Sequence, residues 1–221
     1  MKKHLWLMIG AVVAVAAIVV SLIFVFTPNE NEPEVVTPDL SGDWTAVATY
    51  VGDVPTYTDG QYAAFKDGVA YFYKDGQFTA PYAESAYTIN EAFQLALPDI
   101  GREYKVDKKT DNVVRLYQDA NTYMLLVRSV SQLSQTQSQG KWQVKMKGEQ
   151  MNNGESLVFN GSKLEYYKAG SATPAATADY VIENSVLKAA ALGMEMRCYP
   201  VGPDCIVMVE QNGIVWELVR E

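Results

Sequence analysis

Hydrophobic and polar residues alternate along most of the chain after residue 40, in short runs that turn residues separate. Residues 142–147 (WQVKMK) alternate without a break, which is the period of a half-buried β-strand. Trp44, Ala46, Ala48 and Tyr50 show the same period, and we place them on one face of a strand. The pattern predicts no long helix after residue 27 and further strands at 69–73, 87–89, 93–97, 113–117, 123–127, 206–209 and 214–219.

Asn-Gly and Asp-Gly pairs separate many of these runs. Both central residues of a type I′ turn need positive φ, and these pairs adopt it most readily. Many short strands with regular turns predict a closed barrel or a sandwich. We expect tight turns at Asp59-Gly60, Asp67-Gly68, Asp75-Gly76, Asn153-Gly154, Asn160-Gly161 and Asn212-Gly213.

The same series of motifs occurs twice. Gly42-Asp43-Trp44 recurs as Gly140-Lys141-Trp142 and Leu126-Val127-Arg128 as Leu218-Val219-Arg220, at offsets of 98 and 92 residues. A duplication of this length predicts two copies of one small domain rather than a short-repeat solenoid. We assign the copies to residues 41–130 and 140–221, joined by a Ser/Gln-rich linker at 131–139.

A continuous apolar run occupies the N-terminus. Lys2 and Lys3 precede 22 uncharged, mostly apolar residues at 5–26, and about 20 such residues cross a bilayer as a helix. The alternative is a cleaved signal peptide, whose apolar region is usually only about 7–15 residues long. We therefore predict an uncleaved, single-pass transmembrane helix at 5–26. The positive-inside rule then leaves residues 1–4 in the cytoplasm and the rest outside, with the Pro-containing, acidic stretch 27–40 as a spacer.

Charge and composition exclude several functions. The net charge of −8 argues against nucleic acid as a partner. The only histidine is His4, which removes Ser-His-Asp and Cys-His catalysis and most zinc sites from the two copies. We therefore predict no enzyme, no catalytic residues, no cofactor and no metal ligands. The many carboxylates leave a hydrolase of the envelope as a third hypothesis behind the two below.

The two cysteines, Cys198 and Cys205, enclose the turn-rich stretch YPVGPD. Outside the cytoplasm an even pair of cysteines is usually oxidised. We therefore predict a hairpin loop closed by a structural disulfide. The alternative, a redox-active dithiol, lacks the C-x-x-C spacing that would support it.

The duplicated motifs give each copy a resemblance to the lipocalin-like β-barrels of the calycin group. Such barrels begin with Gly-x-Trp, as at Trp44 and Trp142, and carry an arginine near the end of the last strand, as at Arg128 and Arg220. The resemblance implies that each arginine stacks on its tryptophan and closes one end of its barrel. It implies an all-β fold of two tandem, small, antiparallel lipocalin-like barrels behind one transmembrane helix.

Both copies are shorter than ligand-carrying lipocalins and lack the helix that follows the last strand there. A small eight-stranded barrel has an interior that side chains can fill. Tyrosines are the alternative binding surface, since the chain has 14 of them and their rings suit a groove. The aromatic residues expected to fill the barrels are Tyr50, Phe65, Tyr71, Tyr73 and Tyr87 in the first copy and Phe159, Tyr166, Tyr180 and Trp216 in the second.

These observations give two main hypotheses on function. The first is a membrane-anchored, extracytoplasmic, non-enzymatic binding or assembly module of a bacterial cell envelope, with an envelope protein as its partner. The second is a carrier or sensor of a small apolar ligand held in or between the barrels. An assembly module predicts filled barrels and an exposed apolar patch of several hundred Å². A carrier predicts a cavity of about 300 Å³ or more, lined by aromatic residues.

Overall fold

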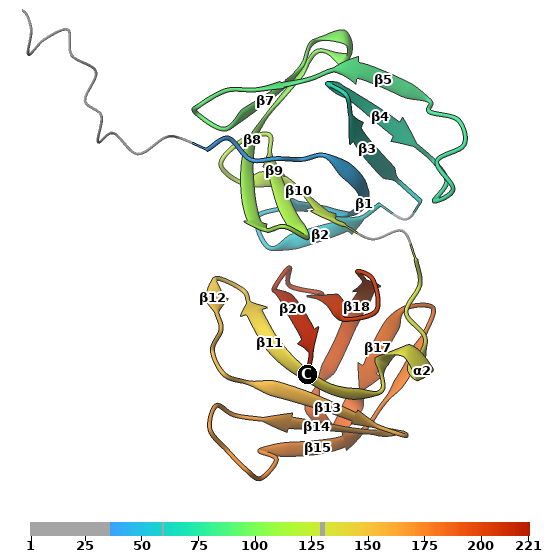
Figure 1. Cartoon of the computed structure of the whole chain (residues 1–221), viewed down its shortest axis with the longest axis vertical. Coiled ribbons are helices and arrows are strands. Elements are labelled where there is room, and N and C mark those ends of the chain that lie inside the picture. Colours follow the sequence, from blue (N-terminus) through green and yellow to red (C-terminus); the bar gives the residue numbers. More distant parts are fainter. Residues whose placement is uncertain (1–35, 59, 129–130) are drawn as a thin grey trace, which may run out of the picture. The chain divides into compact units, whose positions relative to one another are not determined.

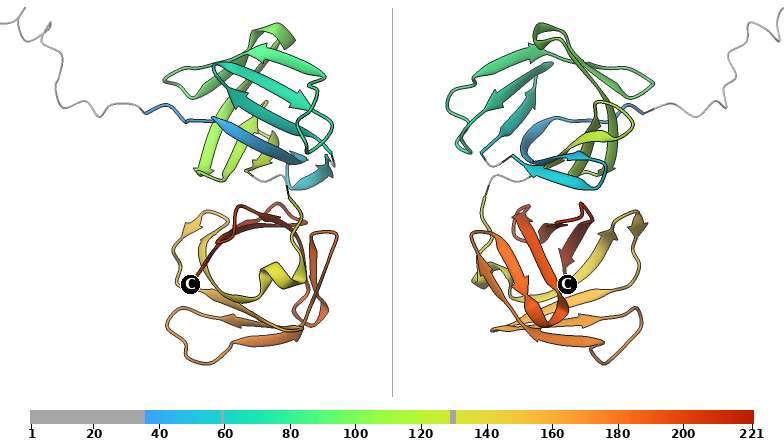
Figure 2. Two further views of the ribbon diagram at one scale, coloured as in Figure 1. Left: turned by 45° about the vertical axis from the view of Figure 1, so that its right-hand side comes forward. Right: turned by 180° about the vertical axis from the view of Figure 1, so that it is seen from behind.

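Two nearly closed antiparallel β-barrels follow each other along the chain (Figures 1 and 2). The computed structural model describes residues 36–58, 60–128 and 131–221, and residues 37–221 form one unit. The predicted membrane helix at 5–26 and the first part of the predicted spacer lie outside the described residues. Within the part of the chain that is described, no helix is both long and apolar enough to cross a membrane.

The first barrel is a single antiparallel sheet with the strand order β5-β4-β3-β1-β10-β9-β8-β7-β6, and β2 pairs with β1 outside this order. A short 3-10 helix, η1 (Pro98–Ile100), connects β7 to β8. The strands are β1 (Gly42–Val51), β2 (Val54–Tyr57), β3 (Tyr62–Lys66), β4 (Val69–Tyr73), β5 (Ala83–Ala86), β6 (Thr88–Ile89), β7 (Gln94–Leu97), β8 (Arg102–Thr110), β9 (Val113–Tyr117) and β10 (Thr122–Val127).

The second barrel repeats this topology strand for strand, in the order β15-β14-β13-β11-β20-β19-β18-β17-β16, with β12 paired to β11. A 3-10 helix, η2 (Ala190–Leu192), takes the place of η1, and a short helix, α2 (Gln135–Ser138), precedes the barrel inside the predicted linker. The strands are β11 (Gly140–Lys147), β12 (Gln150–Met151), β13 (Ser156–Asn160), β14 (Lys163–Tyr167), β15 (Ala176–Asp179), β16 (Val181–Glu183), β17 (Val186–Ala189), β18 (Met194–Pro200), β19 (Cys205–Glu210) and β20 (Val215–Arg220).

Turn chemistry explains the two-residue hairpin between β3 and β4. Asp67 and Gly68 are the only two residues between β3 and β4, and their φ angles are 51° and 79°. Positive φ at both positions is the condition for the two-residue turn that matches the twist of paired strands. The alternating sequence on each side therefore pairs in one register, with Lys66 opposite Val69.

The first strand of each barrel carries a β-bulge at an equivalent position. In β1 the register with β10 shifts between Ala46 and Ala48, and in β11 the register with β20 shifts between Val144 and Met146. One extra residue reverses which face the later side chains occupy. Trp142 and Val144 therefore lie in the core of the second barrel, whereas Met146 points out of it.

The outward-facing residues beyond the bulges form a third hydrophobic core between the barrels. It draws on the same three strands of each copy, namely β1, β9 and β10 of the first barrel and β11, β19 and β20 of the second. Tyr50 belongs to this core and stacks on Tyr123 with a centroid distance of 4.8 Å. Its assignment to the interior of the first barrel was wrong, because the bulge turns it outward. The buried members are Val47, Ala48, Tyr50, Val113, Leu125, Val127, Met146, Val207, Val209 and Val215.

Polar contacts border this interbarrel core. Glu217 is fully buried, and its Oε1 accepts hydrogen bonds from Lys145 at 3.0 Å and from Asn112 of the first barrel at 3.2 Å. The carboxylate of Glu149 forms ion pairs with Lys109 at 2.7 Å and with Arg115 at 2.9 Å, both from the first barrel. A buried carboxylate is tolerated only when charge and hydrogen bonds compensate it, so the two barrels depend on each other at Glu217.

The predicted disulfide is absent, and both cysteines are free. In the register of β18 with β19, Cys198 lies opposite Met208, three positions away from Cys205. Cys198 points into the core of the second barrel with Met208, whereas Cys205 shares the outward parity of Val207. Because alternate residues of a strand point to opposite faces, the two thiols lie on opposite sides of the sheet. The sequence spacing indicated a hairpin correctly but did not reveal this parity.

We expect both thiols to resist alkylation in the folded protein. Burial raises the pKa of Cys198 and of Cys205 to about 12, and the thiolate is the reactive form. Iodoacetamide at pH 8 should leave the native chain largely unmodified. In denaturant without reductant it should label both cysteines, as read by intact mass spectrometry. A denatured chain that takes up no label would mean that the cysteines are paired after all.

Candidate functional site

One end of each barrel is closed by a tryptophan and an arginine. The Arg128 guanidinium carbon lies 4.5 Å from the ring centroid of Trp44, and that of Arg220 lies 4.1 Å from the ring centroid of Trp142. Both indoles are buried. The structure thus brings together both pairs that the sequence singled out, in a cation–π geometry worth roughly 0.5–2 kcal/mol each.

The glycine of each Gly-x-Trp motif makes room for the arginine. Gly42 and Gly140 have φ angles of +114° and +115°, which L side chains rarely adopt. A Cβ at Gly140 would lie 2.9 Å from Arg220 Nη1, and one at Gly42 would collide with Arg128 Nη1. In each motif the glycine therefore supplies the positive-φ backbone and the space for the guanidinium, and the tryptophan supplies the ring on which it stacks.

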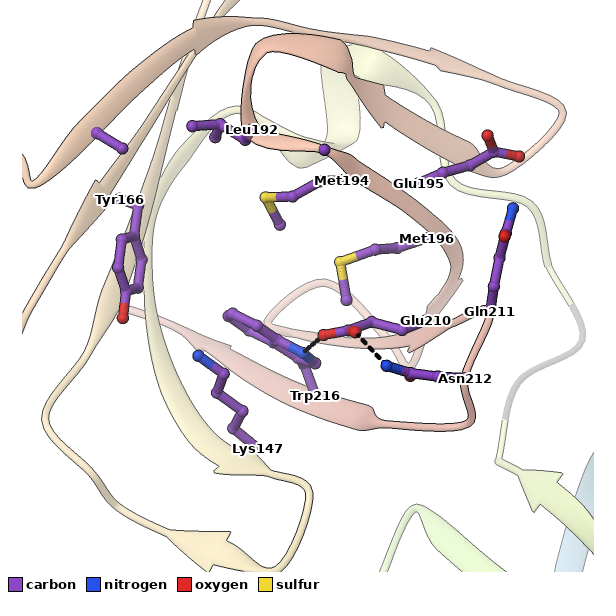
Figure 3. A pocket seen from close by; sticks show the side chains of 12 residues that line it. Lys147, Tyr166, Leu192, Met194, Glu195, Met196, Glu210, Gln211, Asn212 and Trp216 are labelled. Carbon is purple, nitrogen blue, oxygen red and sulfur yellow. Dashed lines mark hydrogen bonds between the residues drawn. The ribbon is translucent and has the colours of Figure 1, made fainter. Parts of the chain in front are cut away.

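The second barrel opens into a pocket of about 570 Å³ at the other end of β11, where Lys147 ends the strand that contains Trp142 (Figure 3). Met194 and Met196 of β18 point into the cavity, and Tyr166 and Trp216 face it from β14 and β20. Leu192, Gly193 and Ala176 add small and apolar surface, and Glu195, Glu210, Gln211 and Asn212 complete the lining.

A lysine lies against the aromatic wall of this pocket. The Lys147 ammonium is 4.2 Å from the ring centroid of Trp216 and 5.6 Å from that of Tyr166. It also forms an ion pair of 3.3 Å with Glu155. Burial acts to raise the pKa of Glu155, but hydrogen bonds from Tyr166 and Lys147 outweigh it, so that pKa lies below its ordinary value. Burial and the bond to Glu155 raise the pKa of Tyr166 to about 12, so its hydroxyl stays protonated at neutral pH.

A carboxylate stands at the edge of the same indole. Glu210 Oε1 accepts a hydrogen bond of 2.7 Å from Trp216 Nε1, and its Oε2 accepts one of 3.1 Å from Asn212 Nδ2. Both donors are neutral, so they fix the carboxylate without cancelling its charge. The pocket therefore offers two aromatic faces, two thioethers, an ammonium and the carboxylates of Glu195 and Glu210.

The first barrel contains a smaller cavity of about 350 Å³. Its lining is mostly aromatic and aliphatic, including Phe72, Tyr82, Tyr104 and Met124. Arg102 is the one charged residue that lines it in the described part of the chain. The two barrels therefore differ in the charge of their cavities although they share one topology.

The sequence pattern missed several residues of the larger pocket. Tyr166 and Trp216 were expected to fill the barrel. Trp216 does belong to its buried core and Tyr166 packs against that core, but both also line the pocket. An unbroken alternation over residues 142–147 would put Lys147 on the face opposite Trp142, but the bulge turns it to the barrel side, opposite Trp216 in β20. Among the described residues, no group of three or more His, Cys, Asp or Glu side chains is placed to hold a metal ion.

Comparison of the chain with protein-family models, with curated proteins and with solved structures finds no match.

We expect the arginines that close the barrels to stabilise the fold. Arg220→Ala removes the stack on Trp142 and hydrogen bonds to the Gln139 and Gln137 carbonyls of 2.7 and 3.0 Å. The free energy of unfolding should fall by about 1–2 kcal/mol, and Arg128→Ala should act similarly. Chemical denaturation followed by circular dichroism measures the change.

Lys141→Ala is the matched control, because it removes an exposed ion pair with Glu221 next to the same tryptophan. We expect it to change stability little, since exposed pairs contribute little. Equal effects of all three substitutions would contradict the role of the Arg–Trp stacks.

Proposed function

We propose that this protein is a non-enzymatic, membrane-anchored binding protein of a bacterial cell envelope, and that its second barrel holds a small ligand. Residues 5–26 serve as the anchor and the two barrels work outside the membrane. The length of the apolar run and the lysines before it support this placement. The observation that carries the binding function is the pocket of about 570 Å³ between Tyr166, Trp216, Met194 and Lys147.

We further propose that each barrel is lipocalin-like. The support is the shared arrangement of Gly-x-Trp on the first strand with an arginine at the end of the last strand. In each barrel the guanidinium lies over the indole, and the indole Nε1 donates to a carbonyl four residues earlier, at 2.8 Å for Trp44 and 2.6 Å for Trp142. Such a barrel is closed at one end and accessible at the other, which is the form that a small-ligand carrier needs.

The carrier hypothesis has more support than the assembly hypothesis. An assembly module was expected to have filled barrels, whereas both barrels contain cavities above about 300 Å³, the range of small-molecule sites. The outward-facing apolar residues of β1, β9, β10, β11, β19 and β20 are already buried between the two barrels. In this proposal the partner is an envelope protein that docks with the carrier or takes the ligand from it.

Native mass spectrometry of the full-length protein, extracted from its own membrane in mild detergent, tests this function. We expect an adduct of a few hundred daltons that is lost on unfolding. Ala176→Phe should remove it, because Ala176 lines the mouth of the second barrel. Ala83→Phe is the matched control: Ala83 begins β5 as Ala176 begins β15, and it lines the cavity of the first barrel.

Loss of the adduct with Ala83→Phe alone would place the ligand in the first barrel. Co-purifying protein subunits without any small-molecule adduct would contradict the carrier function and favour assembly.

A further inference from the structure

The aromatic wall of the second barrel already holds a cation. Lys147 Nζ lies within cation–π distance of the Trp216 and Tyr166 rings, at 4.2 and 5.6 Å. Rings in this arrangement attract an ammonium through their negative faces, most strongly where water is partly excluded. The side chain of Lys147 is 31% exposed, so its ammonium is shielded in part but can still be displaced.

The charges around the pocket favour a further cation. Glu155 neutralises Lys147 through their ion pair. Among the described residues that line the pocket, Lys147 is the only basic one, whereas Glu195 and Glu210 are acidic. Glu210 is fixed by neutral donors alone. A concave site with uncompensated negative charge raises the local concentration of cations.

The remaining walls require an apolar body on the ligand. Met194, Met196 and Leu192 present thioethers and an aliphatic side chain to the cavity (Figure 3). Thioethers are polarisable and pack well against aromatic groups. An inorganic cation would leave this surface uncovered, whereas an aromatic or branched ammonium would cover it.

The first barrel provides an internal comparison. Arg102 begins β8 as Met194 begins β18. Phe72 in β4 has the register of Tyr166 in β14, and Met124 in β10 has the register of Trp216 in β20. That cavity thus has a basic residue, and it lacks the Trp–Lys contact and the carboxylate. Among the described residues these features occur in the second copy and not in the first, so they do not follow from the barrel topology.

We propose that the pocket of the second barrel selects an organic cation, an ammonium with an apolar or aromatic body, and that this cation competes with the Lys147 side chain for the Trp216 face. The inference deepens the proposed binding function and rests on it. Because Lys147 occupies the rings in the absence of ligand, it acts as an internal competitor that sets the affinity.

Isothermal titration calorimetry of the full-length protein with benzyltrimethylammonium and with phenylmethanesulfonate tests the inference. The two probes have a similar size and shape and opposite charge. We expect the cation to bind at least about tenfold more tightly than the anion. Glu210→Gln should weaken cation binding about tenfold, since it removes the charge while keeping the size of the side chain and one accepting oxygen for Trp216 Nε1.

The direction in which Lys147→Gln changes the affinity for the cation is the decisive result. The substitution removes the competing ammonium and leaves Glu155 uncompensated, so affinity for the cation should rise several-fold. Lys163→Gln and Asp179→Asn are the charge-matched controls, because these residues form an exposed ion pair on the same barrel and do not line the pocket. Neither should change the affinity.

Tighter binding of the anion that Lys147→Gln abolishes would overturn the cation selectivity while leaving a ligand site in this barrel. Failure of both probes to bind would overturn the inference as well. An adduct in the native mass spectrum that Ala176→Phe removes would still support the proposed binding function in that case.

Discussion

The β-bulge in the first strand of each barrel is the constraint on which the other features depend. One extra residue at Val47 or Lys145 lets a single strand serve two cores. Its first half buries a tryptophan inside the barrel and its second half presents residues such as Tyr50 and Met146 to the other barrel. The same reversal moves Lys147 from the outer face to the pocket. Without the bulge in β11, Met146 would point into the barrel and Lys147 would point away from the pocket.

In the second barrel, residues of one strand, β11, contribute both to the closed end and to the open end. At the start of β11, Gly140 has a conformation and a free volume that admit the Arg220 guanidinium over Trp142. At its end, Lys147 lies over Trp216 with space in front of it. Both contacts are cation–π contacts, but the first is held by backbone carbonyls and the second by the ion pair with Glu155. That difference separates a structural closure from the proposed binding surface.

Much of the architecture could be predicted from local chemistry. Short segments carry the features that allowed this, namely glycine at positive φ, strand alternation and the repeated Trp–Arg spacing. These segments form the same elements in both copies. The bulges were not predictable in the same way, because the letters WQVKMK fit an unbroken strand equally well. The assignment of Tyr50 to the barrel interior, which depended on parity beyond the bulge, therefore failed. The disulfide failed for a related reason: spacing places two cysteines on one hairpin but does not decide which face each occupies.

The interbarrel core has the form of an isologous contact, because equivalent strands of two copies bury equivalent faces. In a dimer of identical chains every substitution at such a contact appears twice. Fusion into one chain removes this requirement and makes the association independent of concentration. Glu217 shows the effect: its equivalent in the first copy is Leu125, a residue of the interbarrel core. A single buried carboxylate can be compensated by Asn112 and Lys145, whereas a symmetric pair would place two carboxylates at one interface. Joining the copies thus gave each barrel the freedom to change alone, so that one could acquire a pocket chemistry that the other lacks.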